Sequence, residues 1–125
     1  MNVMLDTSAC IEIMRGRAMP QVYRKHRFFI SSVVEVELWA GVYYEGGRRE
    51  REKVIRILSA VEVLPFDSVA AEKTGYVLGA LARLGLKIGD FDSMIAGHCL
   101  ALNYSLITRN FRHFDRVEGL KVIEW

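Results

Sequence analysis

The chain of 125 residues has room for one domain but not for two, so we expect a single domain over residues 1–125. Apolar residues make up 51% of it, enough for a buried core, and the net charge of +2 does not by itself indicate a nucleic-acid partner. No apolar run approaches the roughly 20 residues that span a bilayer, and no signal peptide is visible. Cys10 and Cys99 lie far apart in apolar runs, as buried reduced thiols do. These features predict a cytoplasmic protein with no membrane contact.

The first half of the chain predicts two strands and four helices. In chain order we expect a strand at 3–5, a helix from about 7 to 16, a short basic helix at about 20–27, a strand at 28–30, a helix from Ser31 or Ser32 to Gly46, and an exposed helix at 48–59. Thr7 or Ser8 is expected to cap the first helix. The exposed helix is expected to turn Val54, Ile55 and Leu58 toward the core.

The second half predicts three more strands and two long helices. They are a strand at 61–64, a helix at 68–84 ended by Gly85, a nearly apolar helix at 91–103, and strands at 105–108 and 121–124 joined by a loop or helical turn through Phe114. The helix at 68–84 is expected to bury Val69, Ala70, Val77, Leu81 and Leu84.

Strands that alternate with helices predict an α/β domain with a mainly parallel central sheet of four to five strands. Sites in such sheets form outside the carboxyl ends of the strands. Asp6 ends the first strand, Ser31 ends the second just before the helix that carries Glu37, and Asn110 follows the strand at 105–108. The topology therefore brings polar groups that are distant in sequence to one edge.

Four acidic residues are candidates for this edge. Asp6 taken alone is better explained as a cap of the following helix, whereas Glu37 borders the apolar face of its helix, where an unpaired carboxylate is costly. Asp90 suits an N-cap, and Asp92 lies in the first turn of the most apolar helix, where the helix dipole also favours it. Because clustered carboxylates repel one another, Mg²⁺ or Mn²⁺ is their natural counter-charge.

Four segments resemble, in order and over essentially the whole chain, the toxins of VapBC toxin–antitoxin modules within the PIN-domain family. They are Val-Met-Leu-Asp-Thr-Ser at 3–8, Ile-Ser-Ser-Val-Val-Glu-Val-Glu-Leu-Trp-Ala-Gly at 30–41, Ile-Gly-Asp-Phe-Asp-Ser-Met-Ile-Ala-Gly-His at 88–98, and Ile-Thr-Arg-Asn-Phe-Arg-His-Phe at 107–114. The chain is most similar to the branch described as tRNA(fMet)-specific endonucleases. The resemblance implies a three-layer α/β/α PIN-like domain.

The resemblance also implies which residues form the site. The family's acidic catalytic and metal-binding residues fall on Asp6, Glu37 and Asp92. Its fourth polar position falls on Asn110, where many members have Asp, which leaves a second metal ion in question. Ser8 and Thr108 match hydroxyl positions near the site. Asp90 has no firm counterpart and is treated as an outer residue.

The function implied is divalent-metal-dependent hydrolysis of RNA, with tRNA, and initiator tRNA in particular, as the favoured substrate. Two basic stretches are either solvated faces or phosphate contacts. The candidate RNA contacts within them are Arg15, Arg17, Lys25, Arg109 and Arg112. The resemblance further implies a VapB-type antitoxin partner and a homodimer, for which Trp39, Tyr43 and residues 76–80 are candidate interfaces.

Three other functions fit parts of the pattern. A haloacid-dehalogenase-like phosphatase expects a second Asp two residues after the first, where this chain has Ser8. A response-regulator receiver expects an acidic pair before its phosphorylated Asp and a late Lys, and neither is evident. A non-catalytic PIN-like RNA-binding module remains as the alternative from another class, and the intact acidic set argues against it.

Overall fold

Five strands form one parallel sheet in the order β3-β2-β1-β4-β5 in the computed structural model, which describes residues 2–17 and 25–125. The strands are β1 (Asn2–Leu5), β2 (Arg27–Ser31), β3 (Glu62–Leu64), β4 (Ser105–Thr108) and β5 (Val122–Glu124). The expectation of a mainly parallel sheet of four to five strands is confirmed.

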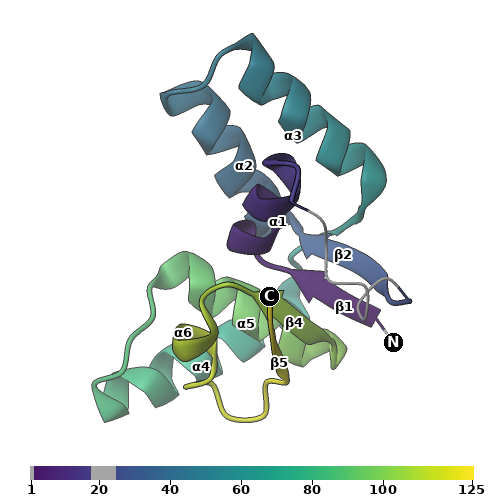
Figure 1. Cartoon of the computed structure of the whole chain (residues 1–125). Coiled ribbons are helices and arrows are strands. Elements are labelled where there is room, and N and C mark those ends of the chain that lie inside the picture. The colour runs from purple at the N-terminus through teal and green to yellow at the C-terminus, as the bar shows by residue number, and fades with distance from the viewer. Residues whose placement is uncertain (1, 18–24) are drawn as a thin grey trace.

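Helices lie on both sides of this sheet. They are α1 (Thr7–Met14), α2 (Ser32–Tyr44), α3 (Arg48–Ala60), α4 (Ser68–Leu84), α5 (Asp90–Leu102) and the short α6 (Phe111–Phe114). In the view of Figure 1, α1 and α3 are drawn above the strands and α4 and α5 below them. The three-layer α/β/α architecture is therefore confirmed. None of the helices that the structure describes combines the length and apolar character needed to cross a membrane.

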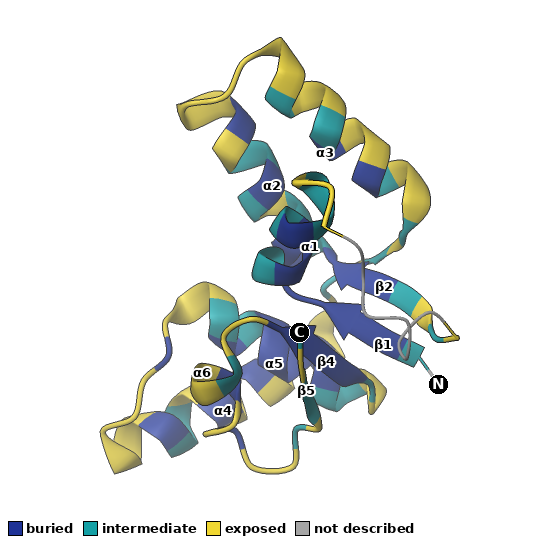
Figure 2. Ribbon diagram, in the orientation of Figure 1, coloured by how far each residue is buried: buried dark blue, intermediate teal, exposed yellow. Residues whose placement is uncertain are grey.

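The central strands are buried on both faces, as a sheet covered on two sides requires. Val3, Met4 and Leu5 of β1 have no exposed surface, and neither have Leu106 and Ile107 of β4. This explains why these short strands are continuous apolar runs rather than alternating ones. In Figure 2, β1, β2 and β4 are mainly dark blue, whereas the outward face of α3 is yellow.

The largest helix contact joins α4 to α5, and a glycine makes it possible. A methyl group at Gly97 of α5 would stand 2.2 Å from Oγ1 of Thr74 and 2.6 Å from its backbone nitrogen. Thr74 is buried and directs its hydroxyl to the carbonyl oxygen of Ala70, 2.8 Å away. This close approach holds α5, and with it Asp92, firmly in place.

The caps of two helices differ in part from those predicted. The N-cap of α1 is Asp6, which the sequence also offered as a cap, rather than Thr7 or Ser8, because its carboxylate accepts a hydrogen bond from the backbone nitrogen of Ala9. The N-cap of α5 is Gly89, whose φ of +98° favours glycine, and Asp90 is the first helical residue. Of the two residues predicted to open the next helix, Ser31 is the N-cap of α2 and Ser32 is its first residue.

Three apolar residues expected in the core are exposed. Ile55 is 47% exposed, Val69 57% and Leu84 68%. Ile55 follows the buried Val54 and Val69 precedes the buried Ala70, so the helix turns each of them about 100° away from the inward stripe. Leu84 is the last residue of α4. The basic helix predicted at 20–27 falls largely outside the described residues, and Arg27 at its end belongs to β2 instead.

Candidate active site

The candidate site lies where the order of the strands changes direction. The chain moves from β1 outward through β2 to β3, then returns to place β4 on the other side of β1. Ligands of open α/β sheets bind outside the carboxyl ends of the strands at such a point. Asp6 follows β1 and Thr108 ends β4, so both side chains stand at this position.

The carboxylate of Asp6 is fixed by three hydrogen bonds. Oδ1 accepts from the backbone nitrogen of Ala9 at 2.9 Å and from Oγ of Ser8 at 2.7 Å, while Oδ2 accepts from Oγ1 of Thr108 at 2.5 Å. Only 2% of Asp6 is exposed, and burial raises its pKa although the three donors counteract this effect. These hydrogen bonds hold both oxygens of the Asp6 carboxylate in a fixed orientation.

The carboxylate of Glu37 comes from α2 and is held by α1. Oε1 accepts a hydrogen bond from Oγ1 of Thr7 at 2.6 Å. Partial burial raises the pKa of Glu37 most, the Thr7 hydrogen bond lowers it, and the charges of Asp92 and Asp6 raise it further. Glu35, two residues earlier, instead accepts from the indole nitrogen of Trp39 at 3.3 Å. The two glutamates therefore diverge, as their helical spacing predicts.

The carboxylate of Asp92 stands in the first turn of α5. Burial raises its pKa most, the charge of Asp6 raises it further, and contact with His113 lowers it. The distance from Nδ1 of His113 to Oδ2 of Asp92 is 3.6 Å. The structure thus brings Asp6, Glu37 and Asp92 close enough for their charges to act on one another.

This acid cluster, Asp6, Glu37 and Asp92, has little positive charge of its own. Across residues 2–17 and 25–125, no lysine or arginine forms an ion pair with any of its members. Burial and mutual repulsion therefore disfavour the simultaneous ionisation of all three, and a bound cation would offset this effect. This electrostatic deficit fits a divalent metal ion.

A divalent cation at the acid cluster would be held partly through water. Within the described part of the chain, no three acidic, histidine or cysteine side chains form a ready cage around one point. Mg²⁺ does not need such a cage, because it usually keeps several waters and takes one or two carboxylates directly. Asp6, Glu37 and Asp92 are the residues that would hold it.

Of the four secondary residues, two contact the cluster through hydrogen bonds. Ser8 and Thr108 both donate to Asp6, and their own oxygens accept from the backbone nitrogens of Arg109 and Asn110 at 2.9 and 2.8 Å. The side chain of Asn110 is not among the groups that bond to the acids in the described chain. Asp90 is exposed at the start of α5 and likewise has no bond to them there.

Three contributors were not predicted from the sequence. Thr7 orients Glu37, His113 approaches Asp92, and Glu12 of α1 binds two arginines. Glu12 is only 5% exposed, which is unusual for a carboxylate, and its helical position four residues after Ser8 was the available signal. The histidine and the threonine gave no comparable signal, because their contacts depend on tertiary structure.

The candidate RNA contacts differ in their surroundings. Nη1 of Arg17 lies 2.5 Å from Glu12 Oε2, and Nη1 of Arg109 lies 3.2 Å from Glu12 Oε1. Arg15, Lys25 and Arg112 are exposed. Part of the positive charge expected for phosphates is therefore balanced within the protein, and the rest faces solvent.

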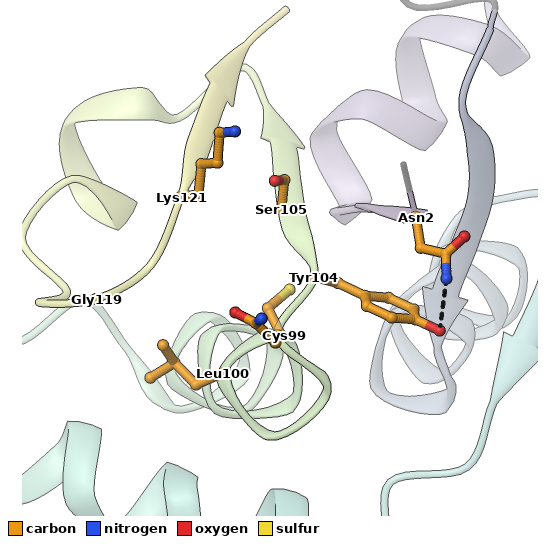
Figure 3. A pocket seen from close by; sticks show the side chains of 8 residues that line it. Asn2, Cys99, Leu100, Tyr104, Ser105, Gly119 and Lys121 are labelled. Carbon is orange, nitrogen blue, oxygen red and sulfur yellow. Dashed lines mark hydrogen bonds between the residues drawn. The ribbon is translucent and has the colours of Figure 1, made fainter.

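Two cavities lie at opposite ends of the strands. One, of about 320 Å³, is lined by Asn2, Tyr104, Ser105 and Lys121 at the amino ends, where Asn2 donates to the hydroxyl of Tyr104 at 3.2 Å (Figure 3). The other, of about 470 Å³, is lined by residues 109–113 and Glu124. Only the second borders the acid cluster, through His113 and the chain next to Thr108.

Comparison with known proteins gives one family and full-length relatives. A family model described as "PIN domain" matches residues 3–120. The chain is 33% identical over 132 aligned residues to a tRNA(fMet)-specific endonuclease VapC of Salmonella typhimurium, and 35% identical to one of Shigella flexneri. Each alignment covers 100% of this chain and 98% of the relative.

Solved structures agree over the same length. A chain of the DNA-bound VapBC structure from Salmonella typhimurium matches with a TM-score of 0.88 at 32% identity, covering 100% of this chain and 98% of that one. VapBC2 of Rickettsia felis, bound to a DNA fragment from its promoter, matches with a TM-score of 0.89 at 29% identity, covering 100% and 99%. Fold and sequence therefore point to the same group of proteins.

Proposed function

Because the chain belongs to the PIN-domain family, and within it to the VapC ribonucleases, we propose that it is a divalent-metal-dependent endoribonuclease and the toxin of a type II toxin–antitoxin pair. The observation that carries the proposal is the convergence of Asp6, Glu37 and Asp92 at the switch point of the sheet. Mg²⁺, or Mn²⁺, is the proposed ion, since carboxylate oxygens are its preferred ligands.

Each residue has a distinct part in the proposed reaction. A bound divalent ion would lower the pKa of an attacking water and compensate the negative charge of the phosphoryl group. Asp6 is the most rigid member, because Ser8, Thr108 and the Ala9 nitrogen fix both of its oxygens. Glu37 and Asp92 are less fully engaged and are suited to orient or deprotonate the water. The product strands carry a new phosphate end and a new hydroxyl end.

The test is cleavage of purified tRNA by the intact protein in Mg²⁺, with EDTA as the control. We expect Asp6→Asn, Glu37→Gln and Asp92→Asn each to lower the cleavage rate by about 100-fold or more. Glu52→Gln, an exposed substitution on α3, is the matched control and should retain full activity. Full activity in any two of the three site variants, or unchanged activity in EDTA, would refute the assignment.

The proposed substrate is structured RNA, with tRNA cut in a loop as the favoured case. Loops expose unstacked bases and flexible phosphates that a shallow site can reach. The choice of initiator tRNA is supported by the names of the Salmonella and Shigella relatives. Binding to RNA should weaken as salt concentration rises, because bound counterions are released. A comparison of tRNA species in the cleavage assay tests the choice directly.

The proposed partner is a VapB-type antitoxin, as in the VapBC complexes of related structure. An arginine or lysine of its C-terminal arm would find an uncompensated acid cluster in this chain. A peptide copied from the arm encoded next to this chain should inhibit cleavage. If it binds equally to the wild type and to an Asp6→Asn/Asp92→Asn variant, the acid cluster is not what it recognises. We place this activity in the cytoplasm, where tRNA is available.

A further inference from the structure

The cavity beside the acid cluster has the size and position of a ligand site. Its volume of about 470 Å³ lies within the range of about 300–1,000 Å³ that small-molecule sites occupy. It is formed by the segment after β4, the short helix α6 and the end of β5. The six lining residues are Arg109, Asn110, Phe111, Arg112, His113 and Glu124.

The cavity is connected to two members of the acid cluster. His113, in its wall, has Nδ1 at 3.6 Å from Oδ2 of Asp92. The backbone nitrogen of Arg109 donates to Oγ of Ser8 at 2.9 Å, and that hydroxyl donates to Oδ1 of Asp6 at 2.7 Å. A strand whose phosphodiester lies at the acids is therefore within one nucleotide of this cavity.

The lining carries the groups that recognise a nucleotide. The lining includes two arginines, Arg109 and Arg112, and one carboxylate, that of Glu124, so basic side chains outnumber acidic ones in the wall. Phe111 is half-buried and offers an aromatic surface, on which bases of RNA stack. The exposed amide of Asn110 supplies both a donor and an acceptor for the edge of a base.

Arg109 is held ready for a phosphate by a buried carboxylate. Oε1 of Glu12 forms an ion pair with Nη1 of Arg109 at 3.2 Å, and Oε2 of Glu12 pairs with Arg17. Its hydrogen bond to Arg17 lowers the pKa of Glu12, so Glu12 is ionised and the contact is charged on both sides. A guanidinium has five N–H donors, and the side chain of Arg109 is 49% exposed, so donors remain for a ligand.

We propose that this cavity binds one nucleotide of the RNA strand next to the cleaved phosphodiester, with its phosphate between Arg109 and Arg112 and its base against Phe111. Glu12 is then a positioning residue that fixes Arg109. The proposal rests on the ribonuclease function proposed above, and it adds the place where the strand is held.

The first experiment measures binding without catalysis. Guanosine and adenosine 5′-monophosphates are titrated into the full chain in EDTA, and amide signals are followed by ¹H–¹⁵N NMR. We expect shifts at residues 109–113 and 122–124, and binding about tenfold weaker in Phe111→Leu. Inorganic phosphate serves as the probe without a base. Equal affinity for phosphate and nucleotide, or shifts elsewhere in the chain, would overturn the proposal.

The second experiment measures cleavage. Phe111→Leu and Arg112→Gln should each raise KM about tenfold and leave kcat within about twofold, because they hold the strand and do not act on the phosphodiester. Arg48→Gln, exposed at the start of α3, is the charge-matched control. Arg112 is exposed, so its variant carries the test if Phe111→Leu is poorly folded.

The outcomes separate the two proposals. A wild type that cleaves no RNA in Mg²⁺ refutes the ribonuclease function, whereas the NMR titration still decides on the nucleotide site. A wild type that cleaves normally, with pocket variants that match Arg48→Gln, refutes the nucleotide site alone. Glu12→Gln adds a check on positioning: it raises net positive charge, so nonspecific RNA binding should not weaken, yet KM for cleavage should rise. Unchanged KM in this variant contradicts the role given to Glu12.

Discussion

The carboxylates of Asp6, Glu37 and Asp92 share an environment that disfavours their charged forms. Burial is the largest cause of the raised pKa in all three, and mutual repulsion adds to it for Glu37 and Asp92. A folded state that binds a proton more tightly than the unfolded chain loses stability as pH rises between the two pKa values. The charged carboxylates of the acid cluster therefore lower the free energy of unfolding of the metal-free protein at neutral pH.

Glu37→Gln measures the destabilisation caused by one of these charges, because glutamine keeps an oxygen that accepts the hydrogen bond from Thr7 but carries no charge. The folded pKa of Glu37 lies above its ordinary 4.5, so the cost appears as pH rises above that value. In EDTA we expect the variant and the wild type to be equally stable near pH 4, and the variant to be more stable at pH 7 by about 1 kcal/mol or less. Urea unfolding at both pH values measures the difference.

Two controls accompany this comparison. Glu52→Gln, exposed on α3, should show no such dependence on pH. Saturating Mg²⁺ should reverse the order at pH 7, because an ion that binds only the folded wild type stabilises it by mass action. A stability difference that is the same at both pH values would contradict the raised pKa of Glu37.

At the scale of residues, the sequence alone predicts a site residue when a charged side chain interrupts an apolar pattern. Asp6 ends a buried strand, and Glu37 interrupts an apolar helix face, so each can be recognised in the amino-acid sequence. Glu12 was not recognised, since the arginines that neutralise it lie 5 and 97 positions further along the chain. The contact between Glu12 and Arg109 forms only when β4 is placed beside β1.

At the scale of elements, the pair α4 and α5 fixes the acidic helix against the rest of the domain. Gly97 allows the two backbones to approach at Thr74, and Val77 and Leu81 of α4 are buried together with Ile95 of α5. Close packing of this kind tolerates no added volume, because a methyl group at Gly97 would meet the backbone of the buried Thr74 as well as its hydroxyl, and a backbone cannot move aside as a flexible side chain can.

Gly97→Ala should therefore destabilise the protein, although alanine is the better helix former. The added methyl group would meet the Thr74 nitrogen at 2.6 Å, and we expect a loss of at least about 2 kcal/mol in the free energy of unfolding. Gly75→Ala in α4 is the matched control: a methyl group there meets nothing within 4 Å, so stability should rise by up to about 1 kcal/mol. Denaturant unfolding measures the free energy of unfolding of both variants. If both are more stable than the wild type, the close contact between Gly97 and Thr74 is disproved.

The elements themselves were predictable because their apolar periods are clear, whereas their ends were less so. Asp6 acts as both a cap and a member of the acid cluster, and the sequence presented these as alternatives. Gly89 caps α5 through a backbone conformation that glycine adopts easily, so no side chain marks that end. The exposure of Val69 and Leu84 shows that α4 is apolar over more of its circumference than the core requires.

At the scale of the whole molecule, this excess apolar surface bears on assembly. Trp39 is used within the chain, since its ring centroid lies 6.5 Å from that of Tyr43 and 5.3 Å from the guanidinium carbon of Arg51. Val77, within the candidate interface at 76–80, belongs to the core. The outward face of α4 remains, with Tyr76, Ala80 and Leu84 at four-residue spacing along a small cavity.

We therefore predict that the isolated chain forms a homodimer through this face of α4. Tyr76 and Leu84 are 52% and 68% exposed, and an apolar stripe on a helix gains stability when a second copy covers it. Light scattering at micromolar concentration should give twice the monomer mass for the wild type. Leu84→Glu should give a folded monomer, because the exposed side chain does not support the core and its charge cannot be buried at an interface. Tyr44→Glu, at a site 84% exposed on α2, is the control and should remain dimeric. A monomeric wild type would refute the dimer, and a dimeric Leu84→Glu with a monomeric Tyr44→Glu would move the interface to α2.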